Sequence, residues 1–242
     1  MPQPLSRAVA RGALLLLLLP PGAFAQTRLL NDTGQTQCVD AANVLQGCTN
    51  VNTGNGAAHP GQDARYGRDA DPSLTKIGGG AAGFDFTRIC WNGQPEGSAQ
   101  CTGVLAENHT ANPSGTPATD WACTRDNVTG LLWSLQTQIA TWNTATVSTY
   151  PDAGHNSASR CGHATGWRLP TRRELLSIVH RGAIGPAVDG AYFPVTVSNF
   201  HWTSDEYKPN TTGAWRVYLN DGTTDAELKT APQFIRLVRS LP

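Results

Sequence analysis

The fold of this chain is decided by the stretch Gly166-Trp167-Arg168-Leu169-Pro170-Thr171-Arg172-Arg173-Glu174-Leu175-Leu176. Its first half alternates apolar residues with small or charged ones, as a brief half-buried strand does. Thr171 is an N-cap candidate, and Glu174 follows three residues later, which is the spacing of a capping box. The apolar residues of 175–179 fall on one face at helical spacing, and Gly182 offers a C-terminal stop. The stretch therefore predicts a strand, a turn and a short amphipathic helix packed on a core.

Short alternating segments lie on both sides of this stretch. The segments that favour β-strands are residues 84–89, 121–125, 130–135, 201–204, 214–219 and 233–239. Asp126-Asn127 predicts the turn of a hairpin, and Asn220-Asp221-Gly222 predicts a second one. Residues 141–149 predict another helix, although their β-branched residues weaken it. The pattern indicates an α+β fold, a mainly antiparallel sheet with one or two helices on it.

The first 25 residues have the pattern of a signal peptide. Arg7 and Arg11 precede the apolar run 13–19, and Ala23-Phe24-Ala25 supplies the small residues that signal peptidase reads. The apolar run is too short to span a membrane, and no cysteine follows Ala25 directly to accept a lipid. We therefore expect a protein secreted to the periplasm or cell surface after cleavage at Ala25.

The charge balance argues against a nucleic-acid or membrane partner. Cleavage removes two arginines and no acidic residue from 18 basic and 18 acidic residues, which leaves a formal charge of −2. The remaining 217 residues fit one domain plus an irregular region. We expect a loop-rich amino-terminal region with short strands at 26–118, because Gly, Asn, Thr, Pro and Ala dominate it, and a domain at 119–242.

Six cysteines in an exported chain predict three disulfides. Sequence alone does not choose among the 15 pairings that six cysteines allow. Short loops are the easiest to close, which favours three pairs: Cys38 with Cys48, Cys90 with Cys101, and Cys123 with Cys161. The last pair would be worth about 4 kcal/mol in the chain-entropy model.

A series of short motifs follows in a fixed order along the carboxyl-terminal half. They are Thr129-Gly130-Leu131-Leu132-Trp133, Trp142-Asn143-Thr144-Ala145, residues 166–175, Tyr192-Phe193-Pro194, His201-Trp202-Thr203-Ser204, Ala214-Trp215-Arg216-Val217 and Val238-Arg239. In this order they resemble the Lcl C-terminal domain family, also called DUF1566, over roughly residues 120–240. The polar run 61–67 and the segment at Phe84 resemble regions that precede such domains.

The resemblance implies a bacterial exported protein with a C-type-lectin-like fold. The best-known member is the adhesin domain of a collagen-like surface protein, which binds sulfated glycans and trimerises. We therefore expect a non-enzymatic binding or adhesion module whose ligand is an extracellular glycan, and the alternative is a structural envelope component that binds another surface protein. Two features depart from the family. Leu237 stands where many members have a cysteine, and the Gly-X-Y stalk that would force three copies together is missing.

Seven tryptophans supply the aromatic faces that sugar-binding sites often use. Four of them lie in alternating strands at family framework positions, so we expect core residues at Trp133, Trp167, Trp202 and Trp215. Trp91 and Trp142 should be more accessible, and they are candidate ligand-binding residues.

Arg172 and Arg173 are the candidates for binding an anion. Guanidinium groups hydrogen-bond well to sulfate and carboxylate, and the start of a helix favours negative charge. Arg168 and Lys208 would add charge if they lie nearby. The alternative is that the two arginines form a solvated first turn of the predicted helix.

No enzyme motif, cofactor or metal site is expected. A sulfatase-modifying-type enzyme of a related fold would need two cysteines near the carboxyl end, and none follows Cys161. A metal site built from His155, Cys161 and His163 fits no standard zinc spacing. Gln94-Pro95-Glu96 faintly resembles the calcium- and sugar-binding tripeptide of C-type lectins, but the Trp-Asn pair precedes it and the following Asp is missing.

Overall fold

The structure is a computed structural model. It describes residues 31–39, 44–48, 62–110, 116–146 and 151–242. The signal peptide expected at 1–25 lies outside these residues. In the described part of the chain, no helix has the length and apolar character needed to cross a membrane.

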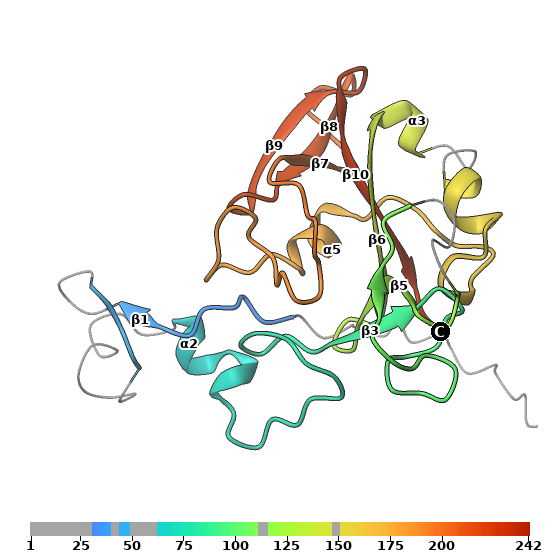
Figure 1. The fold of residues 1–242 in the computed structure, drawn as a ribbon. Helices are drawn as coiled ribbons and strands as arrows, with labels where there is room; N and C mark the ends of the chain where they lie inside the picture. The colour runs from blue at the N-terminus through green and yellow to red at the C-terminus, as the bar shows by residue number, and fades with distance from the viewer. Residues whose placement is uncertain (1–30, 40–43, 49–61, 111–115, 147–150) are drawn as a thin grey trace, which may run out of the picture.

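An eight-stranded sheet forms the body of the molecule (Figure 1). Its strands are β3 Phe86–Cys90, β4 Ala106–Glu107, β5 Asp120–Asp126, β6 Leu131–Thr141, β7 Phe200–Glu206, β8 Gly213–Tyr218, β9 Thr223–Leu228 and β10 Pro232–Ser240. The strand order is β3-β5-β6-β10-β7-β8-β9, with β4 paired to β5. All pairs are antiparallel except β10 with β7 and β4 with β5. The predicted mainly antiparallel sheet is confirmed, and β9 adds a strand whose polar sequence shows no alternation.

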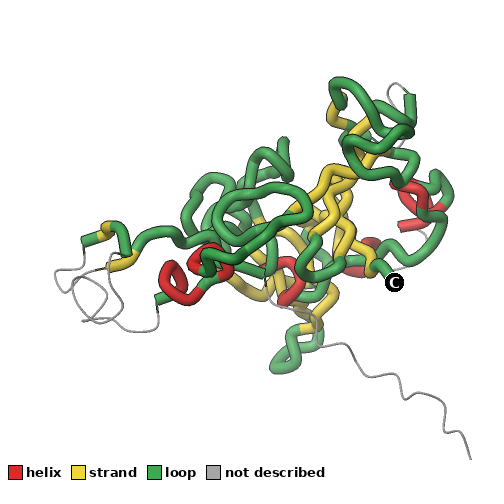
Figure 2. Tube along the Cα trace, turned by 90° about the horizontal axis from the view of Figure 1, so that it is seen from below, coloured by secondary structure: helices red, strands yellow, loops and turns green. Residues whose placement is uncertain are grey.

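The helices are few and short, and Figure 2 shows loops and turns filling much of the space around the strands. They are α2 Asp63–Tyr66, α3 Trp142–Thr146 and α5 Arg172–Leu176, with single turns at Arg68–Ala70, Asp152–Asn156 and Arg160–Gly162. A separate two-stranded sheet of β1 Cys38–Val39 and β2 Leu45–Gln46 lies to one side of the body (Figure 1). The sheet crosses the expected boundary at residue 118, because β3 and β4 both pair with β5.

The capping box at the start of α5 is confirmed. The Thr171 side chain accepts a hydrogen bond from the Glu174 amide (3.2 Å), and the Glu174 carboxylate accepts one from the Thr171 amide (2.8 Å). The helix ends earlier than the sequence suggested, since Leu176 is its last residue and turns follow it. Ile178 and Val179 are nevertheless buried with Leu175, so the apolar face predicted for the segment exists.

Two buried clusters lie on opposite faces of the sheet. Leu132 belongs to one cluster and its neighbour Trp133 to the other, and successive side chains of a strand point to opposite faces. We call the first the disulfide face; it includes Cys123, Ala145, Cys161, Trp167, Leu169, Trp202 and Ala214. We call the second the helix face; it includes Phe84, Phe86, Leu175, Ile178, Val179, Val217 and Leu219.

The three predicted disulfides are present: Cys38–Cys48, Cys90–Cys101 and Cys123–Cys161. The last joins β5 to the turn before Trp167 across a separation of 38 residues. Because the sulfur of Cys161 is bonded to Cys123, it cannot serve as a ligand in the alternative metal site. The short-loop argument therefore chose the right pairing.

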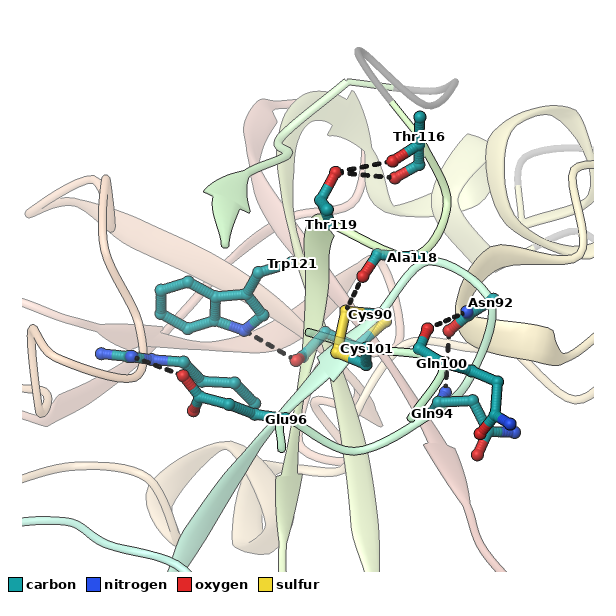
Figure 3. Close-up of a disulfide and its surroundings, with 12 residues drawn as sticks. Cys90, Asn92, Gln94, Glu96, Gln100, Cys101, Thr116, Ala118, Thr119 and Trp121 are labelled. Atoms are coloured by element: carbon teal, nitrogen blue, oxygen red, sulfur yellow. Dashed lines mark hydrogen bonds and ion pairs between the residues drawn. A yellow bond between two sulfur atoms is a disulfide. The ribbon is translucent and has the colours of Figure 1, made fainter. Parts of the chain in front are cut away.

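The loop closed by Cys90–Cys101 is held by its own polar residues. Figure 3 shows Asn92 joining two parts of it, since its Nδ2 donates to the Gln100 carbonyl (2.6 Å) and its Oδ1 accepts from the Gln94 amide (3.0 Å). Glu96, of the lectin-like tripeptide, is paired with Arg88 at 3.2 Å. The disulfide, these hydrogen bonds and the ion pair therefore hold the loop in place at the end of β3.

Candidate functional site

A surface pocket of about 380 Å³ lies where α5 and the turn after it meet the amino-terminal segment. Its volume is within the range typical of small-ligand sites. The lining residues are Asn31, Asp32, Thr33, Arg172, Arg173, Leu176, Ser177, Val179 and Arg181. The structure thus brings the two predicted arginines together with a third, Arg181.

The position of α5 is fixed by charge as well as by packing. Arg168 donates from both terminal nitrogens to the Glu174 carboxylate, at 2.8 and 2.7 Å. The backbone amide of Arg172 donates to the Asp205 carboxylate at 2.7 Å, which ties the helix to β7. With Leu175 fully buried underneath, the helix holds its two arginines at the rim of the pocket.

The charge of Glu174 depends on these contacts. Burial alone would raise the pKa of the Glu174 carboxyl, but hydrogen bonds from Arg168 and from Thr171 outweigh burial and hold that pKa below its usual value. Arg168 is therefore engaged in placing the helix. Lys208, the other candidate for extra charge, is paired with Glu206 at 3.0 Å. Neither of the two lines the pocket.

Residues 31–33 of the amino-terminal segment also line the pocket, and we call residues 31–35 the strap. The Arg181 amide donates to the Thr33 carbonyl, and Gln35 Nε2 donates to the Arg181 carbonyl, both at 2.7 Å. Asn31 Nδ2 donates to the Asp126 carboxylate at 2.8 Å. The strap therefore binds both the turn that carries Arg181 and the β5–β6 hairpin.

The pocket has an excess of positive charge. In the described chain none of its three arginines forms an ion pair with a carboxylate. The acid in its lining is Asp32, which is 6% exposed and accepts hydrogen bonds from the Gly34 and Arg68 amides, both at 2.8 Å. Its charge is thus already satisfied by the backbone. The pocket is complementary to an anionic group, which guanidinium binds strongly.

Arg172 rests on an aromatic side chain that the sequence assigned to the core. Its guanidinium carbon lies 4.2 Å from the centre of the Trp215 ring, and Tyr207 meets that ring edge-on at 5.2 Å. The expectation that Trp215 is buried is wrong, because its side chain is only half-buried. Alternation placed Trp215 on a covered face of the sheet, but there its ring is covered by the side chains of Arg172 and Tyr207, which leave part of it exposed. The stacking holds the Arg172 guanidinium next to the pocket.

The expectation that Trp91 is accessible is also wrong. Its side chain is 5% exposed, and the guanidinium of buried Arg160 stacks on it at 4.6 Å. Trp142 is half-buried: its ring nitrogen donates to the Thr203 carbonyl at 2.8 Å, and Lys229 Nζ lies 4.4 Å from the ring centre. Both tryptophans pack on the disulfide face. The structure therefore does not bring them to the arginine pocket.

A polar pair lies inside the disulfide face. His155 Nε2 is 2.8 Å from Ser134 Oγ, a geometry that nucleophile and base share in many hydrolases. Both residues are buried, with 3% and 0% exposure, and burial together with the nearby charge of Arg160 lowers the pKa of His155 well below 6.5. In this structure the pair is closed to a substrate, so its visible role is to satisfy polar groups in the core.

Residues 122–239 match the model of the Lcl C-terminal domain family. The resemblance predicted from the ordered motifs is confirmed over these residues. The family indicates an extracellular, surface-associated module, and the three disulfides are compatible with that location. No curated protein matches the chain.

Proposed function

We propose that this chain, which carries an Lcl C-terminal domain at residues 122–239, is an exported non-enzymatic binding module that recognises anionic glycans in the arginine pocket. The observation that carries the proposal is the pocket itself. Arg172, Arg173 and Arg181 line about 380 Å³, and none of the three forms an ion pair in the described residues, although hydrogen bonds, helped by the charge of Arg181, lower the pKa of the Asp221 carboxyl. A sulfated sugar unit supplies both the negative charge and the volume that such a site favours.

The C-type-lectin-like fold belongs to the same proposal. A mainly antiparallel sheet with few short helices and long disulfide-braced loops supports it. Fold alone does not determine a ligand, so the arginine pocket and the family resemblance support the choice of an anionic glycan.

The test is binding of the mature chain, residues 26–242, to an array of sulfated and neutral glycans at two salt concentrations, with and without a calcium chelator. We expect binding to sulfated glycans that weakens at high salt, because exposed charge pairs are screened. Arg172→Ala with Arg173→Ala should reduce it. A matched control is Arg125→Ala with Arg239→Ala, since these arginines lie outside the pocket.

A protein partner is the competing outcome. Absence of binding to every glycan on the array would refute the glycan proposal and favour the structural envelope component that binds a surface protein. Equal binding of sulfated and neutral glycans would instead indicate that the glycan-binding site does not involve the arginines.

A further inference from the structure

We propose that the strap, residues 31–35, belongs to the binding site. Docking of the strap on the turn that carries Arg181 and binding of an anionic saccharide then stabilise each other. The inference rests on the proposed glycan-binding function and deepens it. It assigns a binding role to residues that precede the family match at 122–239 by almost ninety positions.

The strap forms the wall that turns an arginine-rich surface into a pocket. Asn31, Asp32 and Thr33 line it together with Arg172 and Arg173. Their polar side chains are occupied elsewhere: Asn31 bonds Asp126, Asp32 accepts two backbone amides, and the Thr33 hydroxyl donates to Asp63. The strap therefore encloses the site and leaves the guanidinium groups as the groups that attract the ligand.

The strap also fixes the third arginine. Its Thr33 carbonyl and Gln35 side chain bind the amide and the carbonyl of Arg181, one on each side of that residue. The Arg181 side chain is turned by a further bond from its Nη1 to the Asp221 carbonyl at 3.1 Å. Because a ligand that contacts Arg181 needs this turn in place, binding and strap docking favour one another.

Gly34 shows how closely the strap fits. Its φ is +80°, and a Cβ added there would lie 2.5 Å from Nδ1 of His180. The His180 ring is not free to give way, since it accepts a hydrogen bond from the Gly182 amide (3.0 Å) and packs against Phe84 with ring centres 5.6 Å apart. Any side chain at position 34 therefore pushes the strap off the turn.

The experiment compares two glycine variants of the mature chain. Gly34→Ala adds the clashing Cβ, whereas Gly103→Ala is the matched control, because Gly103 has φ +83° and open space around it. The two glycines have nearly the same positive φ, so the main difference between the variants is the contact of the added Cβ with His180. The probe is a heparin oligosaccharide, measured by calorimetry. We expect Gly34→Ala to bind about tenfold more weakly and Gly103→Ala to bind as wild type, since loss of one charged contact is worth about that much.

A second measurement needs no ligand. Hydrogen exchange of the Arg181 amide should be slow in the wild type and fast in Gly34→Ala, and heparin oligosaccharide should slow it further in the wild type. Gln35→Ala, a milder change, should raise the exchange rate if Gly34→Ala does not fold. Fast exchange in the wild type overturns the inference whether or not a glycan binds. Equal affinity of both glycine variants overturns it while leaving the glycan proposal intact, and no binding by the wild type refutes both.

Discussion

The two faces of the sheet are closed in different ways. The disulfide face is covered by residues 142–146 and 151–170, and the Cys123–Cys161 bond ties the second segment to β5; this face buries Trp91, Trp167 and Trp202. The helix face is covered by the five-residue helix α5 and the turns after it, held by a capping box and one ion pair. The pocket opens beside this lightly held cover. Under the proposed function, the disulfide face therefore supports stability and the helix face carries the binding site.

The largest expected effect breaks the cover of the disulfide face. Cys123→Ser with Cys161→Ser should destabilise the protein by about 4 kcal/mol, because the bond closes the longest loop of the three. Cys90→Ser with Cys101→Ser should cost about 3 kcal/mol, because its loop is shorter. Urea unfolding checks the order. Equal losses for the two double variants would mean that the longer Cys123–Cys161 loop does not make the larger contribution to stability.

Acid should weaken both faces through a buried histidine on each. Burial, helped by the charge of Arg236, lowers the pKa of His201 to about 3, and burial lowers the pKa of His155 well below 6.5. A histidine that is neutral in the fold gains a proton on unfolding, so its contribution is complete above about pH 6.5 and is lost as the pH falls toward the folded pKa. The expected loss through His201 is about 2 kcal/mol between pH 7.5 and pH 5, and His155 shifts stability in the same direction.

Unfolding in urea at pH 7.5, 6 and 5 tests this prediction. His201 pairs with Val217 on the helix face, and His155 contacts Ser134, which pairs with Cys123 on the disulfide face. His201→Gln and His155→Gln should each flatten the dependence of stability on pH, because each removes a histidine whose pKa is lowered in the fold. If only one of the two variants flattens the pH dependence of the free energy of unfolding, acid destabilises the protein through one face only.

A smaller effect is expected at the cover of the helix face. Thr171→Ala removes the side-chain half of the capping box and should cost about 1 kcal/mol. Hydrogen exchange should rise over α5, while the protected amides of β5 and β6 stay unchanged. Ser198→Ala is a suitable control, since its hydroxyl bonds Asn220 outside any helix. Faster exchange in β5 would show that the two faces unfold together.

The smallest change in stability is expected at the pocket. Arg172→Ala with Arg173→Ala removes two groups without carboxylate partners in the described residues, and such surface changes stay within about 0.5 kcal/mol. Binding of a sulfated glycan should fall at the same time. A large loss of stability would mean that stacking of Arg172 on Trp215 supports the fold of the helix face.

Local sequence rules predicted local features well. The capping box depends on two residues three apart, and the disulfides depended on loop lengths of 10, 11 and 38 residues. Alternation of apolar and polar residues located most strands, because it too depends only on residues that are close in sequence. The rules gave the face on which Trp215 points, but they gave no measure of how far α5 would cover that face.

The pocket needed contacts that no local rule contains. Arg181 lies beyond the end of α5, and the strap reaches it from about 150 positions away in the chain. A cluster of three arginines within ten residues is the signal that could have added Arg181 to the candidates. Trp91 was misjudged for a similar reason, because its partner Arg160 is distant in sequence.

The place of β10 has a consequence for the order of assembly. This strand follows all the others in sequence, yet it lies between β6 and β7 in the sheet. Until it arrives, β3-β5-β6 and β7-β8-β9 are separate ribbons with open edges toward each other (Figure 1). A chain leaving a translocation channel from its amino terminus would hold these two edges exposed until residues 232–240 emerge, and exposed strand edges are where chains aggregate. The rate at which the chain emerges and chaperone protection over that interval therefore bear on the yield of folded protein.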